Sequence, residues 1–383
     1  MSVYLDYNST TPIDDRVLDV MIDIYKNHIG NADSRTHLHG ENTRIIVEDS
    51  RKKVASLLNV KSDEVFFTSG ATESNNIAIQ GLKQYAIQNN KKHIITTSIE
   101  HKSVLETIKE MERQGFAVDY INPDVNGRIN INEIKNKLRD ETFLVSIMHV
   151  NNETGIIQPV QEIGEFLKDK DVFFHVDATQ SCGKLVNEIK NINYSMLSFS
   201  AHKLCGPQGV GCLILKKKRY KLPPVKNILY GGQQEHGIRP GTIPVALVAG
   251  CGKACEIAEE EYLEHEVLLR EIKNEFLGIL DDSEVPYHFN GNPEYCMNNT
   301  MNICFEGVMS EALMISTKQY CSISNGSACT SKSYSPSYVL TNMGIPKEKV
   351  ECSVRISWGY NTNKREAVSN FKNLIEVVKS LAL

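Results

Sequence analysis

The run Ser198-Phe199-Ser200-Ala201-His202-Lys203 places a lysine directly after a short β-like segment. A second such segment, Val172–Val176, is followed by Asp177. In open α/β sheets ligands bind beyond the carboxyl ends of the strands, where both side chains fall. A lysine amine can form a Schiff base with the aldehyde of pyridoxal phosphate (PLP), and an aspartate can keep its pyridine nitrogen protonated. Alone, Lys203 would be interpreted as a surface lysine, but the pair predicts a PLP site.

Short apolar runs alternate with helical patterns from about residue 65 onward. This alternation predicts an α/β fold with a mostly parallel central sheet covered on both faces. We expect a large domain at residues 15–255 and a smaller α+β domain formed by residues 1–14 and 256–383. The expected strands are Val65–Thr68, His93–Thr97, Ala117–Ile121, Phe143–Val150, Val172–Val176, Met196–Ser200, Gly211–Leu215, Thr300–Phe305 and Ser353–Ser357. The expected helices are Glu73–Gln88, Lys102–Gln114, Val160–Lys168, a long region from Pro244 to about Leu280, and Lys364–Leu381.

Composition and charge exclude several classes of protein. The formal net charge is -5, so no global basic field favours direct binding of nucleic acid, and the basic run Lys216–Arg219 is typical of a solvated loop. No apolar stretch approaches the roughly 20 residues of a membrane helix, and the N-terminus lacks a basic targeting segment. We therefore expect a cytoplasmic protein without a membrane contact.

The ten cysteines show no metal-binding or disulfide spacing, because no Cys-x-x-Cys occurs, and we expect no metal site. Small buried hydrophobic side chains in a reducing compartment are the expectation for most of them, namely Cys182, Cys205, Cys212, Cys251, Cys255, Cys304 and Cys352.

Two glycine-containing runs are candidates for contacts with a phosphate. Thr68-Ser69-Gly70-Ala71-Thr72-Glu73 follows a strand and opens a helix, so its small residues would let a phosphate approach free backbone N–H groups. As an isolated motif it is more typical of a simple helix cap. The run Gly231–Thr242 is glycine-rich enough to pass near a ligand.

Further polar residues follow other strands. His101 comes just after His93–Thr97, where an imidazole could stack on a pyridine ring and move protons, although a lone histidine there is more often a cap. Asn152 follows the strand Phe143–Val150, and Gln180 lies three residues beyond Asp177. The Asn152 amide could reach a cofactor hydroxyl or a substrate carboxylate, and Gln180 would lie one helical turn beyond Asp177.

Cys329 lies in the small, polar stretch Ser324–Ser331, unlike the other cysteines. We expect an exposed and mobile loop over about residues 322–335 that lets this thiol move as a nucleophile. Arg355, in the strand-like run Ser353–Ser357, would seek a carboxylate partner, which could be a substrate or a structural ion pair.

Taken together, these motifs closely resemble the group I (NifS/IscS-type) cysteine desulfurases, within the class V aminotransferase-like, fold-type I PLP enzymes. The resemblance covers nearly the whole chain. It rests on Tyr4–Tyr7 with Thr10–Pro12, Thr68–Asn75, Glu100–Lys102, His149–Gly155, His175–Gln180, Ser198–Lys203, the Cys329 loop and Arg355.

The resemblance implies a set of cofactor-binding residues, namely Ala71, Thr72, His101, Asn152, Asp177, Gln180, Ser200, His202, Lys203 and Thr242. Lys203 would hold PLP, Asp177 would pair with the ring nitrogen, Gln180 would contact the ring hydroxyl, and His101 would stack on the ring and act in catalysis. The phosphate would be bound by Ala71, Thr72, Ser200 and His202, with Thr242 reaching across from the other subunit of a homodimer.

The resemblance also implies the substrate and the reaction. Asn152 and Arg355 would hold the carboxylate of L-cysteine, with Asn31 nearby. Cys329 would attack the substrate sulfur and keep it as a persulfide, with L-alanine as co-product, before transfer to an acceptor protein.

Two alternatives stay open: another PLP lyase, such as a selenocysteine lyase-like enzyme, and a non-catalytic sulfur-transfer adaptor. The acceptor is also open among iron–sulfur cluster assembly, tRNA thiolation and DNA phosphorothioation. Because the helix Lys364–Leu381 runs almost to Leu383, we expect weak binding to an iron–sulfur scaffold of the housekeeping type.

Overall fold

A seven-stranded sheet forms the centre of the larger of two units in the computed structural model, which describes residues 2–326 and 336–382. The strand order is β2-β8-β7-β6-β5-β3-β4, and only β8 runs antiparallel to its two neighbours. The predicted α/β fold with a mostly parallel sheet is therefore confirmed. The strands are β2 (Val65–Thr68), β3 (His93–Thr97), β4 (Ala117–Ile121), β5 (Thr142–Met148), β6 (Phe173–Asp177), β7 (Met196–Ser200) and β8 (Gly211–Leu215).

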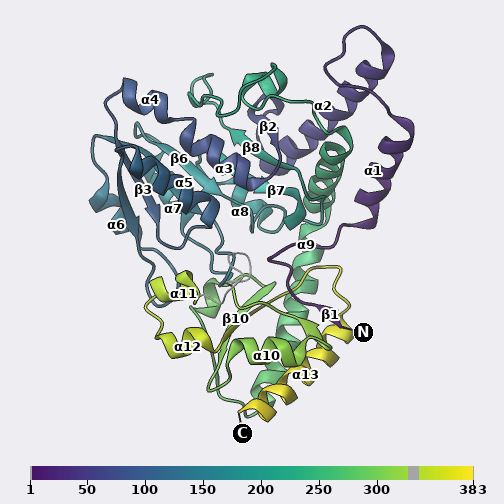
Figure 1. Ribbon diagram of the computed structural model, residues 1–383, viewed down its shortest axis with the longest axis vertical. Helices are drawn as coiled ribbons and strands as arrows, with labels where there is room; N and C mark the ends of the chain where they lie inside the picture. The colour runs from purple at the N-terminus through teal and green to yellow at the C-terminus, as the bar shows by residue number, and fades with distance from the viewer. Residues whose placement is uncertain (1, 327–335, 383) are drawn as a thin grey trace.

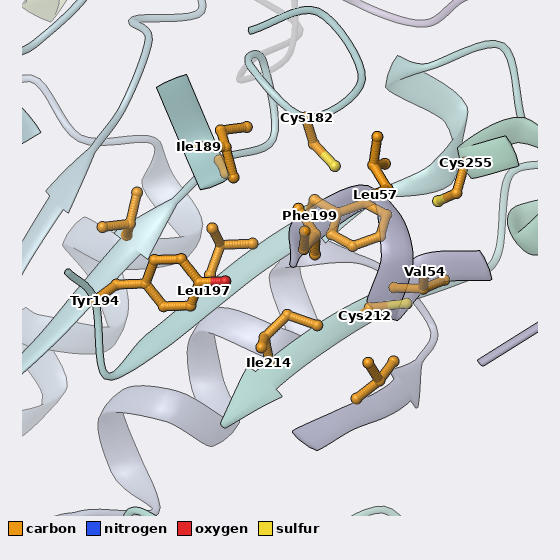
Figure 2. Packing of buried hydrophobic residues seen from close by; sticks show 14 of the residues in the cluster. Val54, Leu57, Cys182, Ile189, Tyr194, Leu197, Phe199, Cys212, Ile214 and Cys255 are labelled. Carbon is orange, nitrogen blue, oxygen red and sulfur yellow. The ribbon is translucent and has the colours of Figure 1, made fainter. Parts of the chain in front are cut away.

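The alternation of side chains along β7 shows how this sheet is covered. Leu197 and Phe199 point to one face, where they pack with side chains of β8 and of α2 (Leu38–Leu58), as Figure 2 shows. Ser198 and Ser200 belong to the opposite face, because successive side chains of a strand alternate between faces. The polar positions of β7 thus face α3 (Ala71–Gln80), and Ser200 is bonded to its first residue.

Helices lie on both faces of the sheet (Figure 1). The helix expected at Glu73–Gln88 is broken into α3 and α4 at Gly81, which packs closely against Val225 and whose carbonyl accepts the backbone N–H of Lys226 at 2.9 Å. Two helices that the sequence pattern does not predict, α1 and α2, precede the sheet; the buried face of α2 includes Thr43 and Arg51, which interrupt its apolar period. The helices of this unit are α1 (Asp15–Asn27), α2, α3, α4 (Lys83–Gln88), α5 (Lys102–Arg113), α6 (Ile131–Lys137), α7 (Val160–Leu167) and α8 (Val186–Lys190).

The smaller unit contains a three-stranded antiparallel sheet, β12-β10-β9, and a parallel pair formed by β1 and β11. Its core is separate and surrounds Trp358, Phe276 and Phe371. The N- and C-terminal ends both lie at this unit (Figure 1). Its elements are β1 (Val3–Tyr4), β9 (Tyr287–Phe289), β10 (Thr300–Phe305), β11 (Cys321–Ser322), β12 (Ser353–Ser357), α10 (Ser310–Thr317), α11 (Tyr338–Asn342), α12 (Lys347–Glu351) and α13 (Lys364–Leu381).

One helix, α9 (Val245–Asp282), runs through both units (Figure 1). Its first part, from Val248 to Ala258, packs into the core of the large unit, and its last part, from Leu269 to Leu280, into that of the small unit. The predicted domain boundary after residue 255 falls inside this helix, three residues before its last side chain in the larger core.

The seven cysteines expected to be buried are buried. Within residues 2–326 and 336–382, no helix combines the length and apolar character needed to span a membrane.

Candidate active site

A cavity of about 800 Å³ opens at the carboxyl ends of β5, β6 and β7. This is the edge at which open α/β sheets bind ligands. Most of the predicted site residues line it: Ala71, Thr72, His101, Asn152, Asp177, Gln180, Ser200, His202, Lys203 and Arg355.

Asp177 ends β6 and is 4% exposed. Its carboxylate accepts hydrogen bonds from the backbone N–H and the hydroxyl of Thr179, and from Nδ2 of Asn75 on α3 at 2.9 Å. His175, two residues earlier on the same face, lies between the hydroxyls of Ser146 and Ser198. Burial lowers the pKa of His175 to about 4, so this ring is neutral. Because Thr179 and Asn75 hold it, the Asp177 carboxylate is oriented before any ligand binds.

His101 is the N-cap of α5, and its Nδ1 accepts the backbone N–H of Ser103 at 3.1 Å. The Ser103 hydroxyl lies 2.8 Å from the same Nδ1 and accepts a hydrogen bond from Asn75. Burial lowers the pKa of His101, so the ring is neutral at pH 7. Because Nδ1 accepts hydrogen bonds, the ring proton of His101 lies on Nε2.

Lys203 follows β7 and reaches the N-terminal segment of the chain. Its Nζ donates to the carbonyl oxygen of Asn8 at 2.5 Å and to that of Ser9. Gln180 donates from Nε2 to the same Asn8 carbonyl at 2.9 Å. Asn8 and Ser9 also line the cavity, and they are site residues that sequence reasoning missed.

The corner predicted to bind phosphate is formed by the start of α3 and the end of β7. Ser200 accepts the backbone N–H of Ala71 at 2.7 Å. Gly70, at the N-cap of α3, has a φ of +150° and supplies no capping side chain. His202 lies beside it with Nδ1 3.0 Å from the Thr10 hydroxyl, and burial lowers its pKa to about 4.

Arg355 on β12 forms the corner predicted to bind the substrate carboxylate. Arg355 is 3% exposed, and its guanidinium donates to the backbone carbonyl of Asn152 at 2.9 Å and to Asp6 at 2.6 Å. The structural ion pair considered from sequence is therefore present. Among the described residues, Nε of Arg355 and Oδ1 of Asn152 are buried without a hydrogen-bond partner.

Two of the predicted site residues that the structure describes are not brought to this cavity. Asn31 and Thr242 are exposed and do not line it. Cys329 lies outside the described residues, but Gly326 and Pro336, where the described chain ends and resumes, both line the cavity. Cys321, the cysteine nearest to Cys329 in the sequence, is buried, and burial raises its pKa to about 12.

Two further acids are buried at this end of the sheet. Burial raises the pKa of Glu100 to about 8 although Thr97 and the backbone N–H of Met148 donate to its Oε1. Burial also raises the pKa of Glu153, which lines the cavity, to about 7.

The residues present fit PLP. The cavity has the volume of a typical ligand site. Asp177 offers a buried carboxylate for a pyridine nitrogen, and the start of α3 offers N–H groups for a phosphate. Oε1 of Gln180 is buried without a partner among the described residues, as expected of a group that a ligand completes.

Comparison with known proteins agrees with this geometry. The model of the family "Aminotransferase class-V" matches residues 3–371. The chain belongs to the class-V aminotransferase family. Class-V aminotransferases use PLP, and this chain is accordingly a PLP-dependent enzyme.

Individual class-V relatives are similar over nearly their full length. "Cysteine desulfurase IscS" of Pasteurella multocida (strain Pm70) is 40% identical, over 100% of this chain and 95% of the relative. A solved "NIFS-LIKE PROTEIN" matches with a TM-score of 0.91 and 34% identity, over 99% of this chain and 100% of that one. The structure "SspA in complex with cysteine" matches with a TM-score of 0.82 and 34% identity, over 94% and 100%.

Some of the residues that sequence reasoning missed could have been found from a local sequence pattern, and others could not. Asn75 lies four residues after Ala71, so helical spacing places it on the same side of α3 and could have indicated it. The contact between Asn8 and Lys203 joins residues that are 195 positions apart in the sequence, and no local pattern indicates it.

Proposed function

We propose that the protein is a PLP-dependent cysteine desulfurase. It converts L-cysteine to L-alanine and keeps the sulfur as a persulfide on Cys329. The observation that carries the proposal is the convergence of Lys203, Asp177, His101 and Arg355 on one cavity. The described ends of the Cys329 segment line the same cavity.

The cofactor would be held by the residues of the two β-strand ends and α3. Asp177 would keep the ring nitrogen protonated, Gln180 would contact the ring hydroxyl, and His101 would stack on the ring. Ala71, Thr72, Ser200 and His202 would bind the phosphate. When bound, PLP supplies an electron-withdrawing ring that stabilises negative charge at the substrate Cα.

The side chains of this cavity orient the substrate and move its protons. Arg355 donates to the carboxylate of L-cysteine from its Nε–H, which is buried without a partner among the described residues, and Asn152 donates to it from its side-chain NH2. Lys203 takes the proton from Cα at its Nζ. His101, neutral with its proton on Nε2, is placed to exchange a proton with the substrate.

Cys329 then takes the sulfur. Its thiolate attacks the substrate sulfur, an S–S bond forms, and the C–S bond breaks with its electron pair left on carbon. That carbon takes up a proton, so L-cysteine and the enzyme thiol become L-alanine and the enzyme persulfide. In the sequence, Cys329 is three residues from Gly326, which lines the cavity.

We further propose that the protein is a cytoplasmic homodimer that passes its sulfur to an acceptor protein. Thr242 is exposed and lies away from the cavity of its own chain, which supports its reaching the phosphate of a second copy. Asn31, also exposed, stays a prediction as a substrate-binding residue.

The test is an assay of the purified protein reconstituted with PLP. We expect a visible absorbance band, its change on addition of L-cysteine, and one L-alanine formed per sulfur released in the presence of a thiol. A protein that binds PLP but forms no L-alanine from L-cysteine would contradict the proposal.

A further inference from the structure

Glu153 lies at the point of the cavity where the described chain ends at Gly326 and resumes at Pro336. It follows β5 in the turn Asn151–Gly155 and is 3% exposed. The Asn151 side chain accepts its backbone N–H at 2.9 Å, and Asn302 donates to its carbonyl at 3.0 Å. Its position is therefore fixed from both β5 and β10.

The chain that resumes after the Cys329 segment is attached to this carboxylate. The Ser337 hydroxyl donates to Oε2 of Glu153 at 2.5 Å and accepts the backbone N–H of Leu340, so it also caps α11. Tyr338 donates to the carbonyl of Glu100 at 2.7 Å, and Asn342 donates to that of Ser98. The start of α11 is thus bound both to Glu153 and to the turn that leads to His101.

Gly326, where the described chain ends before the Cys329 segment, packs against the same Glu153 side chain. A Cβ built on Gly326 would overlap Oε2 of Glu153, and the φ of Gly326 is +80°. Just before it, Ser324 exchanges two backbone hydrogen bonds with Arg355, at 3.1 and 2.5 Å. One carboxylate therefore touches both the entry and the exit of the segment.

We propose that Glu153 is a positioning residue that holds Gly326 and Ser337 together at the cavity, so that the Cys329 thiol is delivered to the substrate sulfur. This inference rests on the proposed desulfurase function. Fixing both ends of a short segment raises the effective concentration of a group that it carries. Glu153 acts on the sulfur-transfer step alone and does not act on cofactor binding.

The charged groups that face Glu153 are Lys102 of α5 and Arg355 of β12, both of which favour its ionised form, while burial opposes it and dominates. Its carboxyl can accept the Ser337 hydrogen in either state. The contact therefore needs the shape and acceptor oxygen of the side chain rather than its charge, and glutamine should replace it.

The experiment compares the holoenzymes of Glu153→Ala and Glu153→Gln with the wild type. The matched control is Glu348→Ala, which removes an exposed carboxylate from the neighbouring α12. Two rates are measured in single turnover: the change in cofactor absorbance on adding L-cysteine, and the formation of L-alanine. We expect Glu153→Ala to slow only the second rate, by about 10- to 100-fold, because misplacement by about 1 Å has such an effect. Glu153→Gln and the control should stay near wild type.

Equal slowing of both rates in Glu153→Ala, or no slowing of L-alanine formation, would overturn the inference. Amide hydrogen exchange supplies a readout independent of activity. Ser337→Ala, which leaves Glu153 in place if Glu153→Ala does not fold, should speed exchange at residues 324–326 and 338–342. Unchanged exchange in both stretches would also overturn it. Failure of the wild type itself to form L-alanine would instead count against the proposed function.

Discussion

The two walls of the cavity are built in different ways. The first, called here the sheet wall, consists of Asp177, Gln180, Ser200 and Lys203 at or just beyond the ends of adjacent strands. The second, the segment wall, consists of Asn8, Asn152, Glu153, Ser337 and Arg355, which come from stretches of chain that are far apart in sequence. The sheet wall takes its geometry from a hydrogen-bonded sheet, whereas the segment wall depends on side-chain contacts between separate stretches of chain.

This difference indicates which part of the reaction each wall serves. Asp177 has its hydrogen bonds before the cofactor binds, as a preorganised electrostatic partner should. In the segment wall, Nε of Arg355 and Oδ1 of Asn152 have no partner among the described residues, and Glu153 has a raised pKa. The sheet wall suits a resident cofactor, and the segment wall suits groups that arrive and leave.

Replacing Lys203 with Ala should have the largest effect and tests the sheet wall. Turnover should fall by several orders of magnitude, because the variant lacks the amine that binds the cofactor and accepts the proton. The visible absorbance band should be lost or shifted as well, which a spectrum of the purified variant would show. Wild-type L-alanine formation in Lys203→Ala would contradict the assignment of the whole site.

Replacing Cys329 with Ser should separate the chemistry at the sheet wall from the transfer of sulfur. The absorbance change on adding L-cysteine should survive, since the sheet wall is untouched, while formation of persulfide and L-alanine should collapse. Cys321 should not substitute, because it is buried and its thiol pKa is raised to about 12. Cys321→Ser serves as the control and should leave sulfur transfer intact; transfer that persists in Cys329→Ser and stops in the double variant would identify Cys321 as the nucleophile.

Replacing Arg355 with Lys should affect substrate binding. The ammonium lacks the rigid planar fork with which the guanidinium faces Asp6, the Asn152 carbonyl and a substrate, so KM for L-cysteine should rise by roughly 10- to 100-fold, as expected for a lost charged hydrogen bond. Steady-state kinetics check this, with the exposed Arg270→Lys as the matched control. An unchanged KM would indicate that Arg355 acts only as the structural partner of Asp6.

Replacing Glu100 with Gln should have the smallest effect, visible only in stability. Burial raises its folded pKa to about 8, above the unfolded value, so the folded state binds the extra proton. The contribution of protonated Glu100 to the free energy of unfolding is fully present below about pH 4.5 and is lost as the pH rises through 8. Denaturant unfolding at pH 5 and pH 9 should therefore show Glu100→Gln gaining on the wild type at the higher pH by on the order of 4 kcal/mol, since the wild type loses about 1.4 kcal/mol for each of the roughly three pH units between 5 and 8. A pH-independent difference between the two proteins would contradict the raised pKa.

The sequence anticipated the two walls unequally, for a physical reason. A strand followed by a polar residue is a local pattern, so the positions of Asp177, Lys203 and His101 could be predicted from short runs. The tie between Lys203 and Asn8 spans 195 residues, and the one between Ser337 and Glu153 spans 184. Contacts at such separation depend on how whole units pack, which no short run encodes.

The fold was anticipated in the same uneven way. Strands β2, β3, β4 and β7 were predicted to the residue, because each is a short run of largely apolar or β-branched residues. The helix α2 was not, because it buries polar side chains such as Thr43 and Arg51. The Arg51 side chain bonds Glu235, a partner that apolar periodicity cannot reveal.

The continuous helix α9 has a consequence for how the molecule comes apart. Between Ala258 and Leu269 it has no buried residue, yet it is helical throughout and its two ends are anchored in different cores. Melting either core would leave that half of the helix unsupported, and isolated helices of this length are marginal in water. We therefore expect the two units to unfold together on heating, because α9 belongs to both cores and loss of one core destabilises the helix on which the other depends.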